Sequence, residues 1–363
     1  MITEMYIENF KSLKRAKVKL NALNVLTGLN GVGKSSFFQP LLLVFQSDEL
    51  GKSIIELNGP LVKTGVGRDV LYQFAHDEKI VFGMSIDNEQ YLWECDYQKD
   101  KDVLISNSRC PDTKSMILRE KVEQFHYINS IRHGPLDIYP KSSEVSEKRQ
   151  IGIMGEYAPY YLDLFGNDYI VPEIMRHPKA VSETLLSQIN AWMKEISPGV
   201  SLSTQSVSTI NIVTLHYQFE YGNSKTNLFL PKNVGSGISY VVPIILVLLT
   251  AEKGKTIIIE NPESHIHPRG QAEIGKLIAL AAQNGAQIFV ETHSDHILNG
   301  IRVAVKEKII DRDKVNILFF DKESTESEQY AKITPIKVDK NGALSDYPDN
   351  FMDEWSNQLS KLI

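Results

Sequence analysis

The sequence predicts an α/β protein in which a mainly parallel sheet is flanked by helices and interrupted by an inserted middle lobe. An apolar strand-like stretch enters a glycine-rich turn near the N-terminus and is followed by a helix-like segment. Between residues 235 and 320, helix-like and strand-like segments alternate. Such alternation favours parallel strands in one sheet. The separate strand-like runs between these two blocks predict the insertion.

The N-terminal elements follow from local periodicity. Strands are predicted at 5–7 and 18–27, and dense apolar residues at helical spacing predict a helix at 35–46. Alternating apolar residues predict hairpin strands within 80–95, so antiparallel strands are expected in this part of the chain. The polar segment 97–114 is expected to be an exposed loop.

The remaining elements are assigned in the same way. In the middle of the chain the predicted helix is 181–196 and the predicted strands are 210–219 and 226–230. Further along, the predicted helices are 238–249, 270–284 and 295–305, and the predicted strands are 256–259, 287–291 and 315–320. The corresponding domains are an N-terminal part of the α/β domain (1–95), the middle lobe (96–230), a C-terminal part of the α/β domain (231–322) and a small tail element (323–363).

Composition narrows the class of protein. The chain of 363 residues has 39 basic and 45 acidic residues and a net charge of −6, which disfavours general coating of nucleic acid. Cys95 and Cys110 lack metal-ligand spacing and are too few for a disulfide framework, as expected in a reducing cytosol. The most apolar stretch, 240–251, is too short to cross a membrane. We therefore expect a cytoplasmic protein without a membrane partner.

Residues 28–35 (GLNGVGKS) fit the phosphate-binding loop G-x-x-x-x-G-K-[ST]. In such a loop, backbone N–H groups surround the β-phosphate, the lysine reaches the β/γ oxygens and the hydroxyl binds Mg²⁺. The apolar strand before the loop and the helix after it favour a nucleotide site over an ordinary glycine turn. The predicted contacts to ATP are Gly28, Asn30, Gly31, Gly33, Lys34, Ser35 and Ser36, with Ser35 as a Mg²⁺ ligand.

Two later strands end in polar residues that complete a nucleotide site. Glu260 follows the apolar run 256–259 and is expected to hold Mg²⁺ through a water molecule. His293 comes one strand later, 33 residues after Glu260, where it can sense the γ-phosphate. The order of these three elements favours ATP and Mg²⁺ as cofactors.

The same motifs, with ENPESHIHP at 260–268 and ETHSDH at 291–296, resemble ABC-type ATPases of the OLD/RecF/SMC branch. Further segments along the chain resemble bacterial AAA-15/AAA-21-like ATPases that end in a small domain of unknown function. These segments are 9–12, 58–60, 132–135, 152–156 and 346–354. The resemblance implies an ABC-type head. Members of the group occur in antiphage defence systems such as Septu and PARIS-like pairs, commonly beside a nuclease or toxin.

The resemblance also implies a signature loop before the Glu260 strand, and residues 233–239 (NVGSGIS) occupy that place. In ABC heads this loop opens a helix that faces the γ-phosphate bound by the other protomer. Glycine stands at the usual serine position, which leaves Ser236 as the hydroxyl donor and Gly237 as the residue that permits close approach. An ordinary helix N-cap at Ser236 or Ser239 is the alternative.

Asn261 follows Glu260 where ABC heads usually carry the general-base glutamate. An amide positions water but does not accept its proton. Either Glu263 substitutes as the base or hydrolysis is slow. Arg132, in the IRHGP segment, could be structural, contact nucleotide or meet a partner.

The sequence supports an ATPase that forms a homodimer or higher homo-oligomer, head to tail around ATP, and controls a separate effector, a nuclease or toxin. The alternative is a RecF/SMC-like DNA-repair ATPase that binds DNA directly, although coiled coils are missing and the chain is acidic. A small-molecule P-loop kinase is a third hypothesis, for which a signature helix would be unnecessary.

Overall fold

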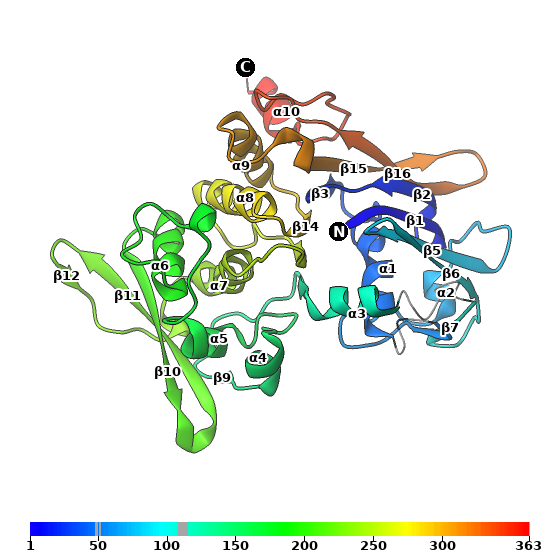
Figure 1. Cartoon of the computed structure of the whole chain (residues 1–363). Coiled ribbons are helices and arrows are strands. Elements are labelled where there is room, and N and C mark those ends of the chain that lie inside the picture. The colour runs from blue at the N-terminus through cyan, green and yellow to red at the C-terminus, as the bar shows by residue number, and fades with distance from the viewer. Residues whose placement is uncertain (48–49, 51, 108–114, 363) are drawn as a thin grey trace. The chain divides into compact units, whose positions relative to one another are not determined.

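The computed structural model describes residues 1–47, 50, 52–107 and 115–362, so Cys110 lies outside the described residues. The chain forms two compact units (Figure 1). Unit 1 comprises Met1–Phe125, Asp313–Asp339 and Leu344–Ile363, and unit 2 comprises His126–Arg312 and Lys340–Ala343. Each unit is described by itself. The predicted middle lobe at 96–230 stays a prediction.

Unit 1 contains a six-stranded sheet in the order β2-β1-β5-β6-β7-β4, and every pair in it is antiparallel. In the second half of β2, Ala16 and Val18 are buried and Arg15, Lys17 and Lys19 are exposed, because successive side chains of a strand point to opposite faces. The strands are β1 Ile2–Phe10, β2 Leu13–Lys19, β4 Ile54–Glu56, β5 Lys79–Ile86, β6 Glu89–Asp96 and β7 Val103–Ser106.

The second part of unit 1 carries the glycine-rich loop. Strand β3 (Leu23–Gly28) pairs in parallel with β15 (Val315–Ser324), which pairs antiparallel with β16 (Gln329–Ile336). Helix α1 (Lys34–Gln46) buries Phe37 against Phe320 of β15, with ring centroids 5.7 Å apart. The loop therefore leaves a buried strand and enters a buried helix. The other helices of this unit are α2 Gly67–Val70, α3 Ser115–Glu123 and α10 Glu354–Ser360.

Unit 2 contains the strand ends predicted to carry Glu260 and His293. Strand β13 (Thr256–Glu260) pairs in parallel with β14 (Gln287–Glu291), with Glu260 opposite Glu291. Strand β8 (Phe125–Ile128) lies on the other side of β13. All β13 residues before Glu260 are buried, as expected of a β-branched strand covered on both faces. The helices around these strands are α7 Ser236–Leu249, α8 Pro268–Gln283 and α9 Asp295–Lys306.

A second sheet of unit 2 is built on a long hairpin. Strand β10 (Val200–Val207) pairs antiparallel with β11 (Ile212–Tyr221), and helix α6 (Leu185–Ile196) contacts β10 (Figure 1). The shorter elements of unit 2 are β9 Tyr139–Pro140, α4 Ser143–Lys148, α5 Ala158–Phe165, β12 Ser224–Lys225 and the 3-10 turns Glu173–Met175, Ser208–Ile210 and Pro231–Asn233; a further turn, Arg312–Lys314, begins on the last residue before unit 1 resumes.

Most predicted helices and strands are confirmed, and the exceptions have physical reasons. The predicted strand 18–27 is wrong: β2 ends at Lys19 and β3 starts at Leu23, because Asn24 bonds back to Asn21 and makes a turn. The predicted loop 97–114 contains β7 and otherwise reaches residues outside the described part. Helix α6 starts at Leu185, four residues after the predicted 181. The predicted strand 226–230 is reduced to one bridge, Tyr217 to Phe229.

Within the described part of the chain, no helix combines the length and the apolar character needed to cross a membrane.

Candidate functional site

The glycine-rich loop of unit 1 depends on backbone conformations that glycine adopts readily. Gly28, Gly31 and Gly33 have φ angles of 138°, 75° and 99°. A Cβ at Gly28 would lie 2.1 Å from the Phe320 carbonyl oxygen, and one at Gly33 would lie 2.4 Å from Ser12 Oγ. A Cβ at Gly31 would meet nothing within 4 Å. The first and last glycines are thus fixed by the packing of unit 1 as well as by φ.

Lys34 begins α1 and bends back over this loop. Its side chain is buried, and Nζ donates to the carbonyl oxygens of Gly28 (3.0 Å) and Leu29 (2.6 Å). Ser35 and Ser36 are half-buried on the first helical turn, while Asn30 and Gly31 are exposed. The first turn of a helix presents N–H groups without intrahelical partners, which suits an anion. All predicted phosphate contacts of unit 1 therefore lie on one loop and one helix start.

In unit 2, Glu260 ends β13 with both carboxylate oxygens engaged. Tyr127 Oη donates to Oε1 at 2.6 Å, and the Ser130 backbone N–H donates to Oε2 at 3.1 Å. Burial, as the larger cause, and the neighbouring Glu260 carboxylate raise the pKa of the Tyr127 hydroxyl well above its ordinary value. Tyr127 therefore stays a protonated donor at neutral pH.

Arg132 fastens the backbone next to Glu260. Its guanidinium is buried and donates to the carbonyl oxygens of Glu260 (2.7 Å), Asn261 (2.7 Å) and Asn129 (3.2 Å). Burial lowers the pKa of Arg132 to about 10, opposed by Glu263 and Glu260, so the group remains charged at neutral pH. Of the roles left open for Arg132, the geometry favours support of the β13 end.

Asn261 has an unusual conformation for a residue other than glycine. Its φ is 45°, its N–H donates to the Glu291 carbonyl at 2.8 Å, and its Oδ1 is buried without a hydrogen-bond partner among the described residues. Asparagine tolerates the left-handed region better than most residues. A buried acceptor without a protein partner suits a water molecule.

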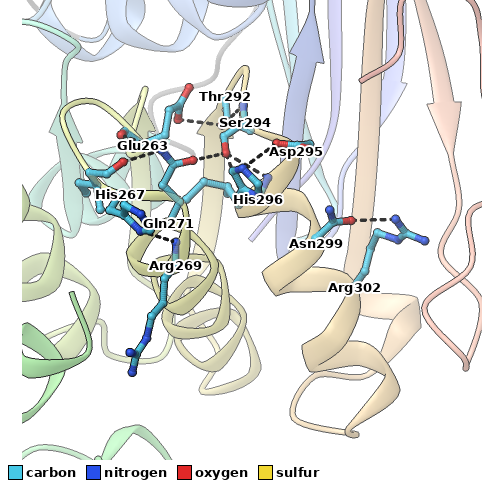
Figure 2. Close-up of polar contacts among 12 residues, drawn as sticks. Glu263, His267, Arg269, Gln271, Thr292, Ser294, Asp295, His296, Asn299 and Arg302 are labelled. Carbon is cyan, nitrogen blue, oxygen red and sulfur yellow. Dashed lines mark hydrogen bonds and ion pairs between the residues drawn. The ribbon is translucent and has the colours of Figure 1, made fainter. Parts of the chain in front are cut away.

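Glu263 connects the Glu260 loop to the loop after β14 (Figure 2). Thr292 Oγ1 donates to Glu263 Oε2 at 2.7 Å, and the His293 N–H donates to Oε1 at 2.9 Å. Ser294, the N-cap of α9, donates to Gln271 Oε1 at 2.5 Å. Because these hydrogen bonds join two loops, the arrangement favours a structural tie, although each Glu263 oxygen keeps a further acceptor position.

The predicted signature loop opens α7. Gly235 and Ser236 are exposed, and a Cβ at Gly235 would meet nothing within 4 Å. A Cβ at Gly237 would lie 2.1 Å from the His265 carbonyl oxygen of the same chain. This contact by itself requires glycine at 237. Packing against His265 therefore explains the glycine without the expected approach of a second protomer.

The structure therefore brings Glu260, Asn261, Glu263 and His293 together at neighbouring strand ends of unit 2. The sequence interpretation missed Tyr127, Ser130 and Thr292. Thr292 lies inside the ETHSDH motif, so its contact with Glu263 was accessible in principle. Tyr127 belongs to the apolar run FHYI before the IRHGP segment, which could have indicated a buried strand ending near Glu260.

Each unit taken by itself offers oxygen donors of the kind that Mg²⁺ prefers, Ser35 in unit 1 and Glu260 in unit 2. No cluster of three or more His, Cys, Asp or Glu side chains that could hold a metal occurs among the residues that the structure describes. Mg²⁺ usually binds one or two carboxylates together with substrate phosphates and water, so a protein cage is unnecessary.

The fold resembles SMC ATPase heads. The chain is 12% identical to the structure described as an SmcHead bound to the C-winged helix domain of ScpA, with a TM-score of 0.57 over 93% of this chain and 98% of that one. It is 11% identical to an Smc head domain with an extended coiled coil, bound to the C-terminal domain of ScpA and derived from Pyrococcus furiosus. That match has a TM-score of 0.52 over 99% of each chain. At these identities the likeness shows the fold, an ABC-type α/β head.

Family models cover most of the sequence. Residues 23–299 match the AAA domain family described as a putative AbiEii toxin of a type IV toxin–antitoxin system, and residues 310–362 match a protein family of unknown function, DUF3696. No curated protein matches the chain significantly. The chain belongs to this AAA domain family and is an ABC-like ATPase.

Proposed function

We propose that this chain binds ATP and Mg²⁺, hydrolyses ATP slowly, pairs head to tail around the nucleotide and thereby controls a separate effector protein. The observation that carries the proposal is the loop at 28–33 with Lys34 folded over it. Its lysine is held by loop carbonyls that a triphosphate can replace as partners, and a helix starts directly after the loop, which favours an anion there. We assign Glu260 and His293 to the same reaction from their order in the sequence.

Slow hydrolysis is supported by the residues after Glu260. Asn261 lacks a proton-accepting group, and both Glu263 oxygens accept hydrogen bonds from Thr292 and His293. A general base typically contributes about 10²–10⁴-fold in rate, so its absence leaves ATP bound for long periods. The unpartnered Oδ1 of Asn261 suits orientation of the attacking water.

Pairing is supported by the exposed start of α7. Gly235 and Ser236 leave the N-terminal turn of a fourteen-residue helix open to solvent, where an anion bound by another copy is favoured. ATP then bridges two surfaces, and its hydrolysis releases them.

A separate effector, a nuclease or toxin in antiphage defence, is the output that we propose. The two SMC heads that this fold resembles were solved with a ScpA domain. The matching family is described as a putative AbiEii toxin of a type IV toxin–antitoxin system. The described residues contain no cluster of three or more potential metal ligands of the kind that an independent nuclease site would need. The effector would therefore be a different chain.

Sedimentation velocity tests the proposal. The wild-type chain should associate when ATP and Mg²⁺ are added, and Lys34→Ala should not. Gly235→Tyr should bind ATP as wild type but fail to associate, because the side chain has free space in its own chain and blocks a partner. Association of Gly235→Tyr equal to wild type would contradict the composite site. ATP-dependent retention of DNA by the purified chain would instead favour a RecF/SMC-like DNA-binding ATPase.

A further inference from the structure

Three residues of the segment 127–132 form hydrogen bonds with the end of β13. Tyr127 Oη and the Ser130 N–H each bind one oxygen of the Glu260 carboxylate, and the Arg132 guanidinium binds the Glu260 and Asn261 carbonyls. We call these three residues the Glu260 clamp. Neither family description nor the proposed function assigns a role to them.

The clamp fixes the orientation of the Glu260 carboxylate and leaves some of its hydrogen-bond acceptor positions open. An ionised carboxylate has about four acceptor positions, and Tyr127 and Ser130 use one on each oxygen. The remaining positions can accept hydrogen bonds from water on a metal ion. A carboxylate held at both oxygens loses the torsional freedom that binding would otherwise remove.

The chemistry of Tyr127 suits this task. The side chain is buried, and burial together with the carboxylates of Glu260 and Glu291 keeps its hydroxyl protonated. A hydroxyl bonded to a charged acceptor at 2.6 Å is among the stronger neutral donors. It can therefore orient Glu260 but cannot serve as the base.

Arg132 completes the clamp through the backbone. Nη1 donates to the Glu260 carbonyl and Nη2 to the Asn261 carbonyl, so the guanidinium spans two consecutive peptide groups where Asn261 adopts φ 45°. A buried charge held by carbonyl oxygens on one strand end resists movement of that end, because any shift would leave the charge unpaired.

We propose that Tyr127 is a positioning residue that orients the Glu260 carboxylate toward metal-bound water, with Arg132 holding the backbone beneath it. The inference rests on the proposed function of Glu260. It predicts that loss of the Tyr127 hydroxyl weakens the response to Mg²⁺ while leaving the nucleotide-binding loop of unit 1 unchanged.

The test is Tyr127→Phe, measured as ATP binding over a range of Mg²⁺ concentrations. The half-saturating Mg²⁺ concentration should rise about three- to tenfold, as expected for one hydrogen bond to a charged group. Tyr161→Phe is the matched control, because Tyr161 is also a buried tyrosine of unit 2 but lies on α5. The control should leave the Mg²⁺ response unchanged.

A double-mutant cycle separates positioning from general damage. In the Glu260→Gln background, Tyr127→Phe should change the Mg²⁺ response less than about twofold, since the charged acceptor is gone. An unchanged Mg²⁺ response in Tyr127→Phe, an equal shift in the Glu260→Gln background, or an equal shift in Tyr161→Phe would each overturn the inference.

Failure of the proposed function has a different signature, because wild-type protein would then bind no ATP at any Mg²⁺ concentration. Melting of the ligand-free proteins still tests the clamp in that case. Tyr127→Phe should lower the melting temperature, and it should do so less in the Glu260→Gln background. Equal lowering in both backgrounds would contradict the contact as a coupled pair.

Discussion

The glycine-rich loop of unit 1 and the acidic strand ends of unit 2 are built on different principles. The loop depends on backbone conformation, because Gly28 and Gly33 have positive φ. A Cβ added at Gly28 would lie 2.1 Å from its nearest neighbouring atom, and one added at Gly33 would lie 2.4 Å from its nearest neighbouring atom. The strand ends depend on side-chain contacts: Tyr127 binds the Glu260 carboxylate and Arg132 its carbonyl. Thr292 binds the Glu263 carboxylate. The glycine-rich loop should therefore be destabilised by an added methyl group, and the strand ends by removal of a single hydrogen-bonding atom.

The largest effect is expected at Gly28. Gly28→Ala places a Cβ against the Phe320 carbonyl at a φ of 138°, which should destabilise the chain by at least about 3 kcal/mol. Gly31→Ala has free space and should cost only about 1–2 kcal/mol from its φ of 75°. Chemical denaturation of both variants measures the difference. Equal stability of the two would show that packing against β15 does not fix the loop.

Lys34→Ala should reduce ATP affinity roughly 100-fold or more, because two charge-assisted contacts to phosphate are lost. The fold should change little, since Lys34 Nζ donates to carbonyls of its own loop. Calorimetric titration with ATP and a melting curve check both statements. ATP affinity equal to wild type would remove the loop from the proposed site.

Glu263→Gln tests whether Glu263 is a structural link between two loops or the general base of hydrolysis. As a tie, Glu263 accepts from Thr292 and His293, so the variant should lose about 1–3 kcal/mol of stability, and Thr292→Val should lose a similar amount non-additively. Steady-state hydrolysis should fall far less than the 10²–10⁴-fold typical of a lost general base. A large loss of rate with an unchanged melting temperature would restore Glu263 as the base.

A smaller change in rate is expected at Asn261. Asn261→Asp keeps a residue that tolerates the left-handed region and adds a carboxylate, so turnover should rise by up to about tenfold. Asn261→Gly is the control, because it preserves the backbone and removes the side chain, and it should not raise turnover. Turnover that is insensitive to the Asp substitution would place the attacking water away from residue 261.

The smallest effect concerns pH and His126, the neighbour of Tyr127 on β8. Burial, and then Lys255, lower the pKa of His126 to about 3, so the folded state holds the neutral form. The unfolded state gains a proton below about pH 6.5, and stability should fall by about 1 kcal/mol between pH 7.5 and 5.5. Melting of His126→Phe over the same range should show a smaller fall. A fall identical to wild type would assign the pH dependence to other groups.

The sequence was sufficient for the elements whose residues act locally. The strand before Gly28, the helix after Gly33 and the alternating block at 238–320 follow from periodicity and glycine chemistry. The likeness to SMC heads and the family model support the ABC-type α/β class on which this order depends.

Contacts between distant segments were beyond such patterns. Tyr127 and Glu260 are 133 positions apart, and Gly237 meets the carbonyl of His265 rather than a neighbour in sequence. The turn between β2 and β3 depends on one asparagine pair inside an apolar run. In each case tertiary contact decides the role of a residue whose type alone permits several.

The central claim is that this chain holds ATP for long periods because Asn261 stands where ABC heads usually carry the general-base glutamate. Chemical quench of wild-type protein mixed with Mg²⁺ and ATP measures the lifetime of bound ATP directly. We predict that bound ATP persists, with turnover below about 1 s⁻¹, the lower end of typical enzyme rates. Turnover near 10 s⁻¹, or the absence of bound ATP, would contradict the account.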